Sequence, residues 1–153
     1  MDSLLVALHV MANLVWIGSI ASVGWLTRRA GDLGGEGGKA IVTTAYELLY
    51  KRVAAPAFGI SFVCGLARML KTTDYYIHAH WFHGKLLFAF VVIGLHHVIG
   101  ARARRLAQSA QNGGPGRDGS MQGAKVSGIL TGALLASALL TVVLVVFQAS
   151  LVK

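Results

Sequence analysis

Residues 126–152 read VSGILTGALLASALLTVVLVVFQASLV and contain no charged side chain. A helix that crosses the hydrocarbon core of a bilayer needs about 20 consecutive, mostly apolar residues. This stretch is longer than that, so it predicts a transmembrane helix. The whole composition agrees, because 55% of the 153 residues are hydrophobic and only 13% are charged, whereas soluble domains have about 25% charged residues.

Three further stretches have the same character. Residues 4–26 contain no Lys, Arg, Asp or Glu, residues 53–70 are interrupted only by Arg68, and residues 81–100 contain Lys85 and three histidines. The helical pattern also continues through residues 40–52 ahead of the second stretch, and Pro56 is a candidate position for a bend. We therefore predict one all-α domain over residues 1–153, an integral membrane four-helix bundle. The predicted helices are 4–26, about 40–71 including a cytoplasmic extension, 81–101 and 125–152.

The net charge of +8 comes from 14 Lys and Arg residues against 6 Asp and Glu residues. Most of the basic residues lie in two glycine-rich links, at 28–39 and 102–125. Basic links face the cytoplasm in multi-pass membrane proteins, so both termini are expected on the periplasmic side of a bacterial inner membrane. The charge thus indicates topology and attraction to anionic lipids, and nucleic acid is not an expected partner.

Few polar side chains lie within the predicted spans. Such groups are costly in lipid and usually face the interior of the bundle, so they are the candidate functional residues. They are His9, Asn13, Arg68, His83, Lys85, His96 and His97.

His9 and His83 are expected at similar depth, because both lie near the outer ends of helices that run in the same direction. Two imidazoles at one depth are the usual axial ligands of a b-type haem, so we predict one haem b held by His9 and His83. Asn13 is a further candidate for contact with the cofactor. Arg68 lies at about the same depth, where a cation can pair with a haem propionate.

The inner half of the third span offers a possible site for a second haem. His83 and His97 are 14 residues apart, which places them on one helix face about 21 Å apart along the axis. Gly94 lies on that face, where a missing side chain admits a flat macrocycle, so Gly94 and His97 are candidate cofactor contacts. The first span offers only His9 as a partner, which favours one haem.

Other interpretations remain open for the histidines. His9 is also suited to hydrogen bonding between helices, and His96 and His97 adjoin the basic end, where polar side chains reach toward headgroups. His78 and His80 lie just before the third span, at the interface. Copper is the alternative metal, with His78, His80, His83, Met11 and Met69 as donors, although these form no tight Met or Cys cluster.

The motifs of the first three spans carry a resemblance to a known family. They are residues 7–10 (ALHV), 15–18 (VWIG), 47–52 (ELLYKR), 65–66 (GL), 81–86 (WFHGKL) and 94–97 (GLHH). With these motifs in this order over about residues 5–106, the sequence resembles the HemJ-type protoporphyrinogen oxidases, which are related to the CopD copper-resistance membrane domain. The family's Asn-Glu element before the last span is absent here.

The resemblance implies a haem b protein that oxidises protoporphyrinogen IX to protoporphyrin IX, with His9 and His83 as the residues to examine as ligands. It also implies that Lys85 is a functional cation beside the porphyrin, and Arg68 is expected to line the same opening. Two alternatives stay open: a haem-carrying or structural subunit without catalysis in a larger membrane electron-transfer complex, and a CopD-like copper-handling protein. The candidate partners are the bilayer, further copies of the chain, a larger membrane complex and a porphyrin substrate.

Overall fold

The structure is a computed structural model that describes the backbone of residues 2–71, 73–112 and 117–147. It describes the side chains of these residues except those of 2 and 117–125. The described residues form helices and no strand, which confirms the all-α fold. The elements are α1 (Asp2–Leu33), α2 (Gly35–Thr44), a π-helix η1 (Ala45–Ala54), α3 (Ala55–Lys71), α4 (Thr73–His78), α5 (His80–Gln111) and α6 (Arg117–Val146).

Four of the described helical segments are long and apolar enough to cross a membrane. They are Ser3–Leu33, Gly35–Lys71, His80–Gln111 and Val126–Val146. The first and third segments continue past their predicted ends at residues 26 and 101, since the polar residues that follow are also helical. Residues 148–152 of the fourth prediction lie outside the described residues. Four spans of this kind make this a multi-pass membrane protein.

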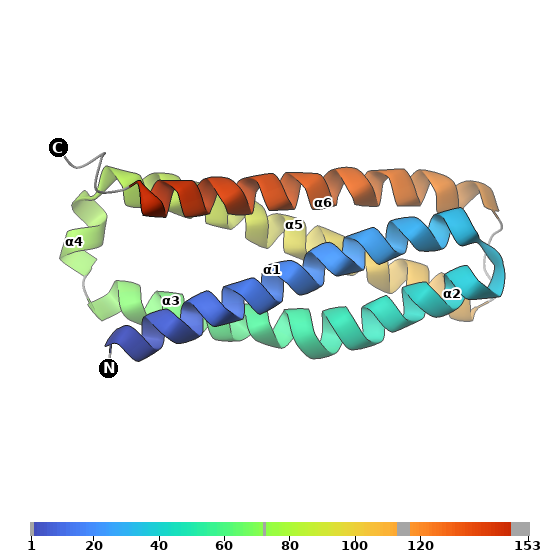
Figure 1. The fold of residues 1–153 in the computed structure, drawn as a ribbon, viewed down its shortest axis with the longest axis horizontal. Coiled ribbons are helices and arrows are strands. Elements are labelled where there is room, and N and C mark those ends of the chain that lie inside the picture. The colour runs from blue at the N-terminus through green and yellow to red at the C-terminus, as the bar shows by residue number, and fades with distance from the viewer. Residues whose placement is uncertain (1, 72, 113–116, 148–153) are drawn as a thin grey trace.

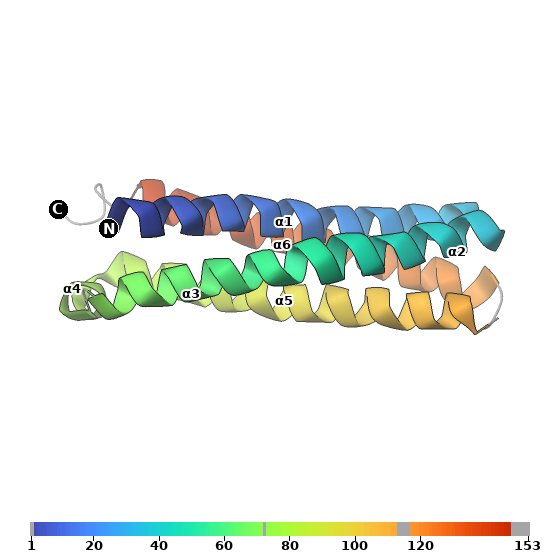
Figure 2. The same cartoon turned by 90° about the horizontal axis from the view of Figure 1, so that it is seen from below.

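The four long segments form an elongated bundle (Figure 1). The short helix α4 lies at one end, which we call the α4 end, and α2 lies at the other, the α2 end. Toward the α4 end, the pair α1 and α3 diverges from the pair α5 and α6 in Figure 1, and α4 connects α3 to α5. Figure 2, turned by 90°, shows α1 and α6 along one side of the bundle and α3 and α5 along the other, with α4 at the end of the α3 and α5 side. The first turn of α1 and the last turns of α6 are both at the α4 end.

The link expected at residues 28–39 is much shorter in the structure. Helix α1 continues to Leu33 and α2 begins at Gly35. The chain reverses at Gly34 and Gly35, whose φ angles are 62° and 53°, in the region that glycine adopts most readily. The remaining glycines of this stretch are helical, and Gly38 packs against the backbone of Ala30. Close packing between α1 and α2 therefore explains why this glycine-rich segment is ordered.

The second long segment contains a π-helix immediately before Pro56. A proline has no N–H to donate, and its ring clashes with the carbonyl group four residues earlier. In η1 the turns are wider, and the N–H of Ala55 donates to the carbonyl of Tyr50, five residues back. The distortion expected at Pro56 thus takes the form of a π-helix, a feature that is frequent at functional sites.

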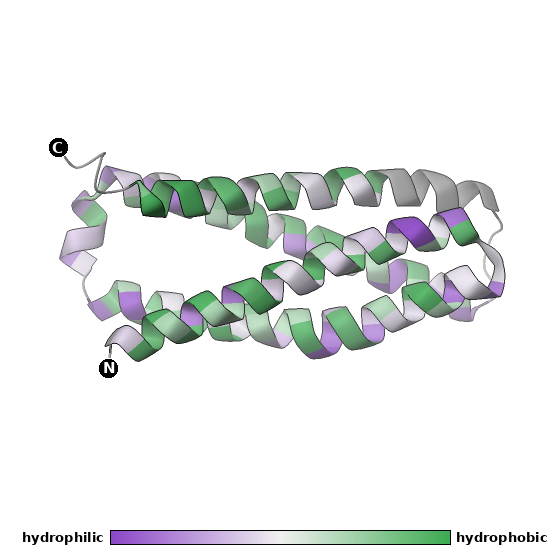
Figure 3. Cartoon of the chain, viewed as in Figure 1, coloured by the Kyte–Doolittle hydropathy of each residue, from purple (hydrophilic) through white to green (hydrophobic). Residues whose placement is uncertain are grey.

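The buried core runs along the middle of the bundle and is built mainly of aliphatic and small residues. Its members are Trp16, Ile20, Val23, Ala54, Ala57, Val92, Ile99, Ala103, Leu134 and Ala138. Many large apolar side chains, among them Leu14, Phe90 and Ile129, face outward instead. Figure 3 shows hydrophobic residues along most of the length of the helices and many hydrophilic residues toward the two ends. Outward apolar faces of this kind suit contact with lipid.

Candidate functional site

His9 lies on α1 and its ring rests against α3. A Cβ atom added at Gly65 would be 2.9 Å from His9 Cε1 and 3.1 Å from Nδ1. Real Cβ atoms do not approach other atoms so closely, so glycine at this position admits the imidazole ring. The ring is half-buried as a result.

Both ring nitrogens of His9 have hydrogen-bond partners. Nδ1 lies 2.7 Å from the carbonyl oxygen of Ser61, and because a carbonyl can only accept, Nδ1 carries the proton and donates. Nε2 is therefore the basic nitrogen, and it accepts a hydrogen bond from Asn13 Nδ2 at 3.0 Å. Ser61 Oγ in turn donates to Asn13 Oδ1 at 2.8 Å, so three side chains and one carbonyl form a closed polar cluster.

This cluster sets the chemistry that His9 can perform. A hydrogen bond from one imidazole nitrogen to a backbone carbonyl is the arrangement that orients metal-ligating histidines and makes the other nitrogen more basic. Here it directs the lone pair of Nε2 toward the Asn13 amide. Rotation of the Asn13 side chain is the one local movement that frees this lone pair for another ligand.

Lys85 on α5 completes the surroundings of His9. Its side chain is half-buried, and its ammonium group is close enough to His9 to interact with it electrostatically. The Nζ atom also lies 5.9 Å from the centre of the Phe82 ring, so an aromatic face shields part of the charge. Polar groups from α1 and α3 therefore contact the imidazole, and the charge of Lys85 on α5 acts on it.

His83 lies on α5, the helix that also carries Lys85. Its side chain is exposed on α5, and among the described residues no hydrogen bond or ring contact joins it to His9. Lys85, two residues later on α5, acts on His9 through its charge. Arg68 is half-buried on α3, about one turn beyond Gly65, so it lies on the α4 side of the cluster.

Gly94 and His97 also lie apart from the His9 cluster. A Cβ atom added at Gly94 would meet nothing within 4 Å, so the missing side chain leaves open space on the outer face of α5. His97 is exposed and lines a cavity nearer the α2 end. Gly94 and His97 therefore lie on an outward face of α5 and do not contact His9.

His96 is buried in the interior of the bundle and does not reach toward the headgroups, which was the alternative interpretation of its position. It is only 1% exposed, and its Nδ1 accepts a hydrogen bond from Trp16 Nε1 at 3.0 Å. The rings of Tyr50 and Phe58 stack near it, with centroid distances of 5.3 and 5.0 Å. The signal that would have found it is Gly100, one turn later, where a Cβ atom would overlap the Tyr50 ring.

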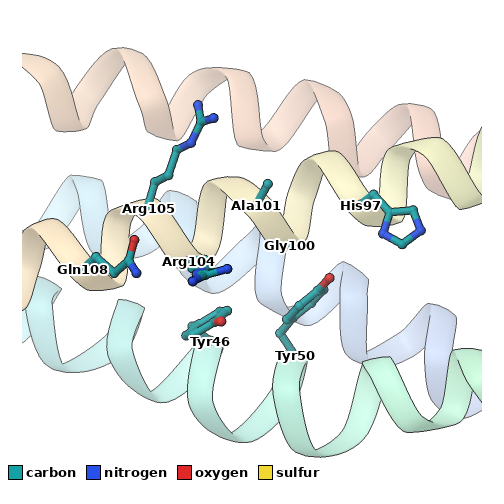
Figure 4. A pocket seen from close by; sticks show the side chains of 8 residues that line it. All are labelled: Tyr46, Tyr50, His97, Gly100, Ala101, Arg104, Arg105 and Gln108. Atoms are coloured by element: carbon teal, nitrogen blue, oxygen red, sulfur yellow. The ribbon is translucent and has the colours of Figure 1, made fainter.

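A cavity of about 550 Å³ lies between η1 and α5 (Figure 4). We call it the α2-side cavity. Tyrosines from η1 form one wall, and the residues of α5 that follow His96 form the other. Its lining residues are Tyr46, Tyr50, His97, Gly100, Ala101, Arg104, Arg105 and Gln108.

A second cavity of about 530 Å³ lies at the α4 end and is lined by residues 75, 78–81, 84 and 144. Trp81 lines it and is 8% exposed, and among the described residues its indole Nε1 has no hydrogen-bond partner. A buried donor of this kind is costly unless an acceptor reaches it. His78 and His80 also line this cavity, but the described residues contain no group of three or more His, Cys, Asp or Glu that could hold a metal.

Comparison with known proteins adds no relative to this description. No family model, no curated protein and no solved structure matches the chain. The resemblance to the HemJ-type oxidases therefore rests on the motifs quoted above.

Proposed function

We propose that this protein is a membrane redox protein that binds one b-type haem beside His9. The observation that carries the proposal is the hydrogen bond of 2.7 Å from His9 Nδ1 to the Ser61 carbonyl. It fixes the tautomer in which Nε2 is unprotonated, which is the form that binds iron. The proposed location is the bacterial inner membrane, with the α2 end in the cytoplasm because most basic residues lie toward that end.

Two residues near His9 support the proposal. Gly65 leaves space for the imidazole against α3, and Lys85 supplies a cation for a propionate. Asn13 has to turn away from Nε2 before iron can bind there. Arg68 is a second candidate cation on the α4 side. When bound, haem supplies an iron centre that accepts and donates single electrons.

His83 is the proposed second axial ligand, as the sequence suggests. Its exposed position makes a direct test necessary, because the charge of Lys85 on the same helix also acts on His9. We expect His83→Ala to convert a low-spin haem spectrum into a high-spin one, and Lys85→Met to lower haem retention without changing the spin state. A spin-state change in Lys85→Met alone would transfer the ligand role from His83 to Lys85.

The proposed reaction is the oxidation of protoporphyrinogen IX to protoporphyrin IX, as in the HemJ-type oxidases. It removes hydrogen from the macrocycle, and the electrons pass to an acceptor in the membrane while the protons are released. In this reaction Lys85 and Arg68 bind the propionates of the substrate and orient its ring. They are the residues that we assign to the catalytic step.

An anaerobic assay tests this step separately from haem binding. Protoporphyrinogen is added to the haem-loaded protein together with a quinone as electron acceptor, and the fluorescence of protoporphyrin is followed. We expect a rate above the spontaneous one that falls in Lys85→Met. A haem-loaded protein that gives no increase would favour the alternative of a haem-carrying subunit in a larger membrane complex.

A further inference from the structure

We propose that the α2-side cavity binds the phosphate group of an anionic phospholipid. The proposal concerns the opposite half of the bundle from His9 and does not depend on haem. It rests on the shape of the cavity, on its charge and on the surface of α5 that leads into it.

The shape follows from η1 and Gly100. Residues four apart lie on one face of a helix, and the rings of Tyr46 and Tyr50 stack at 5.9 Å with an interplanar angle of 17°. Because Gly100 has no side chain, the Tyr50 ring lies directly against the backbone of α5. The two rings therefore form one wall of a cavity that opens toward Arg104 and Gln108 (Figure 4).

The charge of the cavity is positive and, among the described side chains, is not balanced. No described acidic side chain forms a salt bridge with Arg104 or Arg105. Those near the α2 end are already paired with other bases: Asp32 with Arg29 at 4.0 Å, Glu36 with Lys39 at 2.8 Å, and Glu47 with Lys51 at 3.2 Å. A guanidinium group binds phosphate through two parallel hydrogen bonds, so Arg104, which lies beside Tyr46 in Figure 4, favours a phosphate ligand. The Arg105 side chain points away from the two tyrosines (Figure 4) and adds positive charge to the same end of the cavity.

The surface of α5 favours a lipid as the source of that phosphate. Gly94, His97, Ala101 and Arg104 recur at spacings of three and four residues, so they lie on one face of the helix. All four are exposed, and the side chains of Gly94 and Ala101 are small or absent. This face leads from the apolar part of the helix to the arginines, which allows an acyl chain to lie along it while the headgroup enters the cavity.

The depth of the cavity in the membrane also favours a lipid as the source of the phosphate. The uncharged part of the first span ends at residue 26, and the third span becomes basic after residue 101. The cavity therefore lies where the apolar helices reach the polar zone. Basic pockets between transmembrane helices on the cytoplasmic side bind the headgroups of anionic lipids.

Native mass spectrometry of the whole protein in detergent tests the proposal. Phosphatidylglycerol and phosphatidylcholine with the same acyl chains are added in equal amounts. We expect the wild type to retain phosphatidylglycerol preferentially and Arg104→Gln to lower that preference about tenfold, the effect of losing one strong charge-assisted contact. Arg52→Gln is the matched control, because Arg52 is exposed on η1 and does not line the cavity.

Further variants and added phosphate distinguish a lipid headgroup from a soluble phosphate compound. Arg104→Lys keeps the charge but loses the two parallel hydrogen bonds, so an intermediate preference is expected. Equal retention of the two lipids by the wild type, or equal effects of Arg104→Gln and Arg52→Gln in variants with unchanged helical circular dichroism, would overturn it. Displacement of the bound lipid by millimolar inorganic phosphate would instead identify a site for a soluble phosphate compound and contradict the lipid assignment.

Discussion

The His9 cluster and the α2-side cavity differ in how their polar groups are satisfied. At His9, each ring nitrogen already has a partner within the bundle, from Ser61 on one side and Asn13 on the other. In the cavity, Arg104 and Arg105 have no acidic partner among the described side chains, and the space beside them is open. The imidazole can take another ligand only when Asn13 turns away from Nε2, whereas Arg104 and Arg105 can bind a phosphate without breaking a salt bridge to a described acidic side chain.

The largest expected effect comes from closing the space beside His9. In Gly65→Leu the new side chain would overlap the imidazole ring, so we expect complete loss of bound haem, measured as the Soret absorbance per protein. Gly94→Leu is the matched control, because a Cβ atom there meets nothing within 4 Å. Equal haem loss in both variants would show that the haem is not specifically beside Gly65.

The next effect concerns the buried hydrogen bond between Trp16 and His96, which lies between the His9 cluster and the α2-side cavity. Trp16→Phe removes the donor to the buried Nδ1 of His96, and an unsatisfied buried group costs about 1–3 kcal/mol of unfolding free energy. We expect a lower midpoint of thermal unfolding in detergent. Trp25→Phe provides the comparison, since Trp25 is 58% exposed, and an equal loss in both variants would argue against the role of this hydrogen bond.

A smaller effect, of opposite sign, is expected at Asn13. Its amide must leave His9 Nε2 before iron can bind there, so Asn13→Ala removes a competing hydrogen bond that contributes about 1 kcal/mol. We expect haem to bind about fivefold more tightly, as measured by titration of the haem-free protein. Loss of haem from Asn13→Ala would mean that the amide holds the cofactor directly.

The smallest effects are expected where one region is changed and the other is measured. Arg104→Gln should leave the haem spectrum unchanged, and His9→Ala should leave the preference for phosphatidylglycerol unchanged, because the two sites are on opposite halves of the bundle. A change in either crossed measurement, in a variant of normal helicity, would show that the two sites are coupled.

The spans were predictable because length and hydropathy alone decide whether a helix can cross a bilayer. The segment at residues 28–39 was not, because its order depends on Gly38 packing against Ala30, a contact between residues of two helices. The depth of His9 was likewise readable from its position in the first span. Its partners were not, since Ser61 contributes a backbone carbonyl that has no signature in the sequence.

The rotation of α5 explains why the other site residues were harder to predict. A helix face is defined by small angular differences, and these separate exposed His83 from half-buried Lys85 and exposed His97 from buried His96. The position of a residue along the chain indicates its depth in the membrane, but not whether it faces the bundle. The side of α5 that faces the bundle is set by packing such as that of Tyr50 against Gly100. Neighbouring residues in one motif therefore have different environments.

A reduced-minus-oxidised absorption spectrum of the purified protein shows whether His9 holds a haem. The wild type should show the Soret and α bands of haem b, His9→Ala should lose them, and His78→Ala should keep them as a histidine control at the α4 end. A well-folded wild type without these bands, or a His9→Ala variant that retains them in full, would contradict the account.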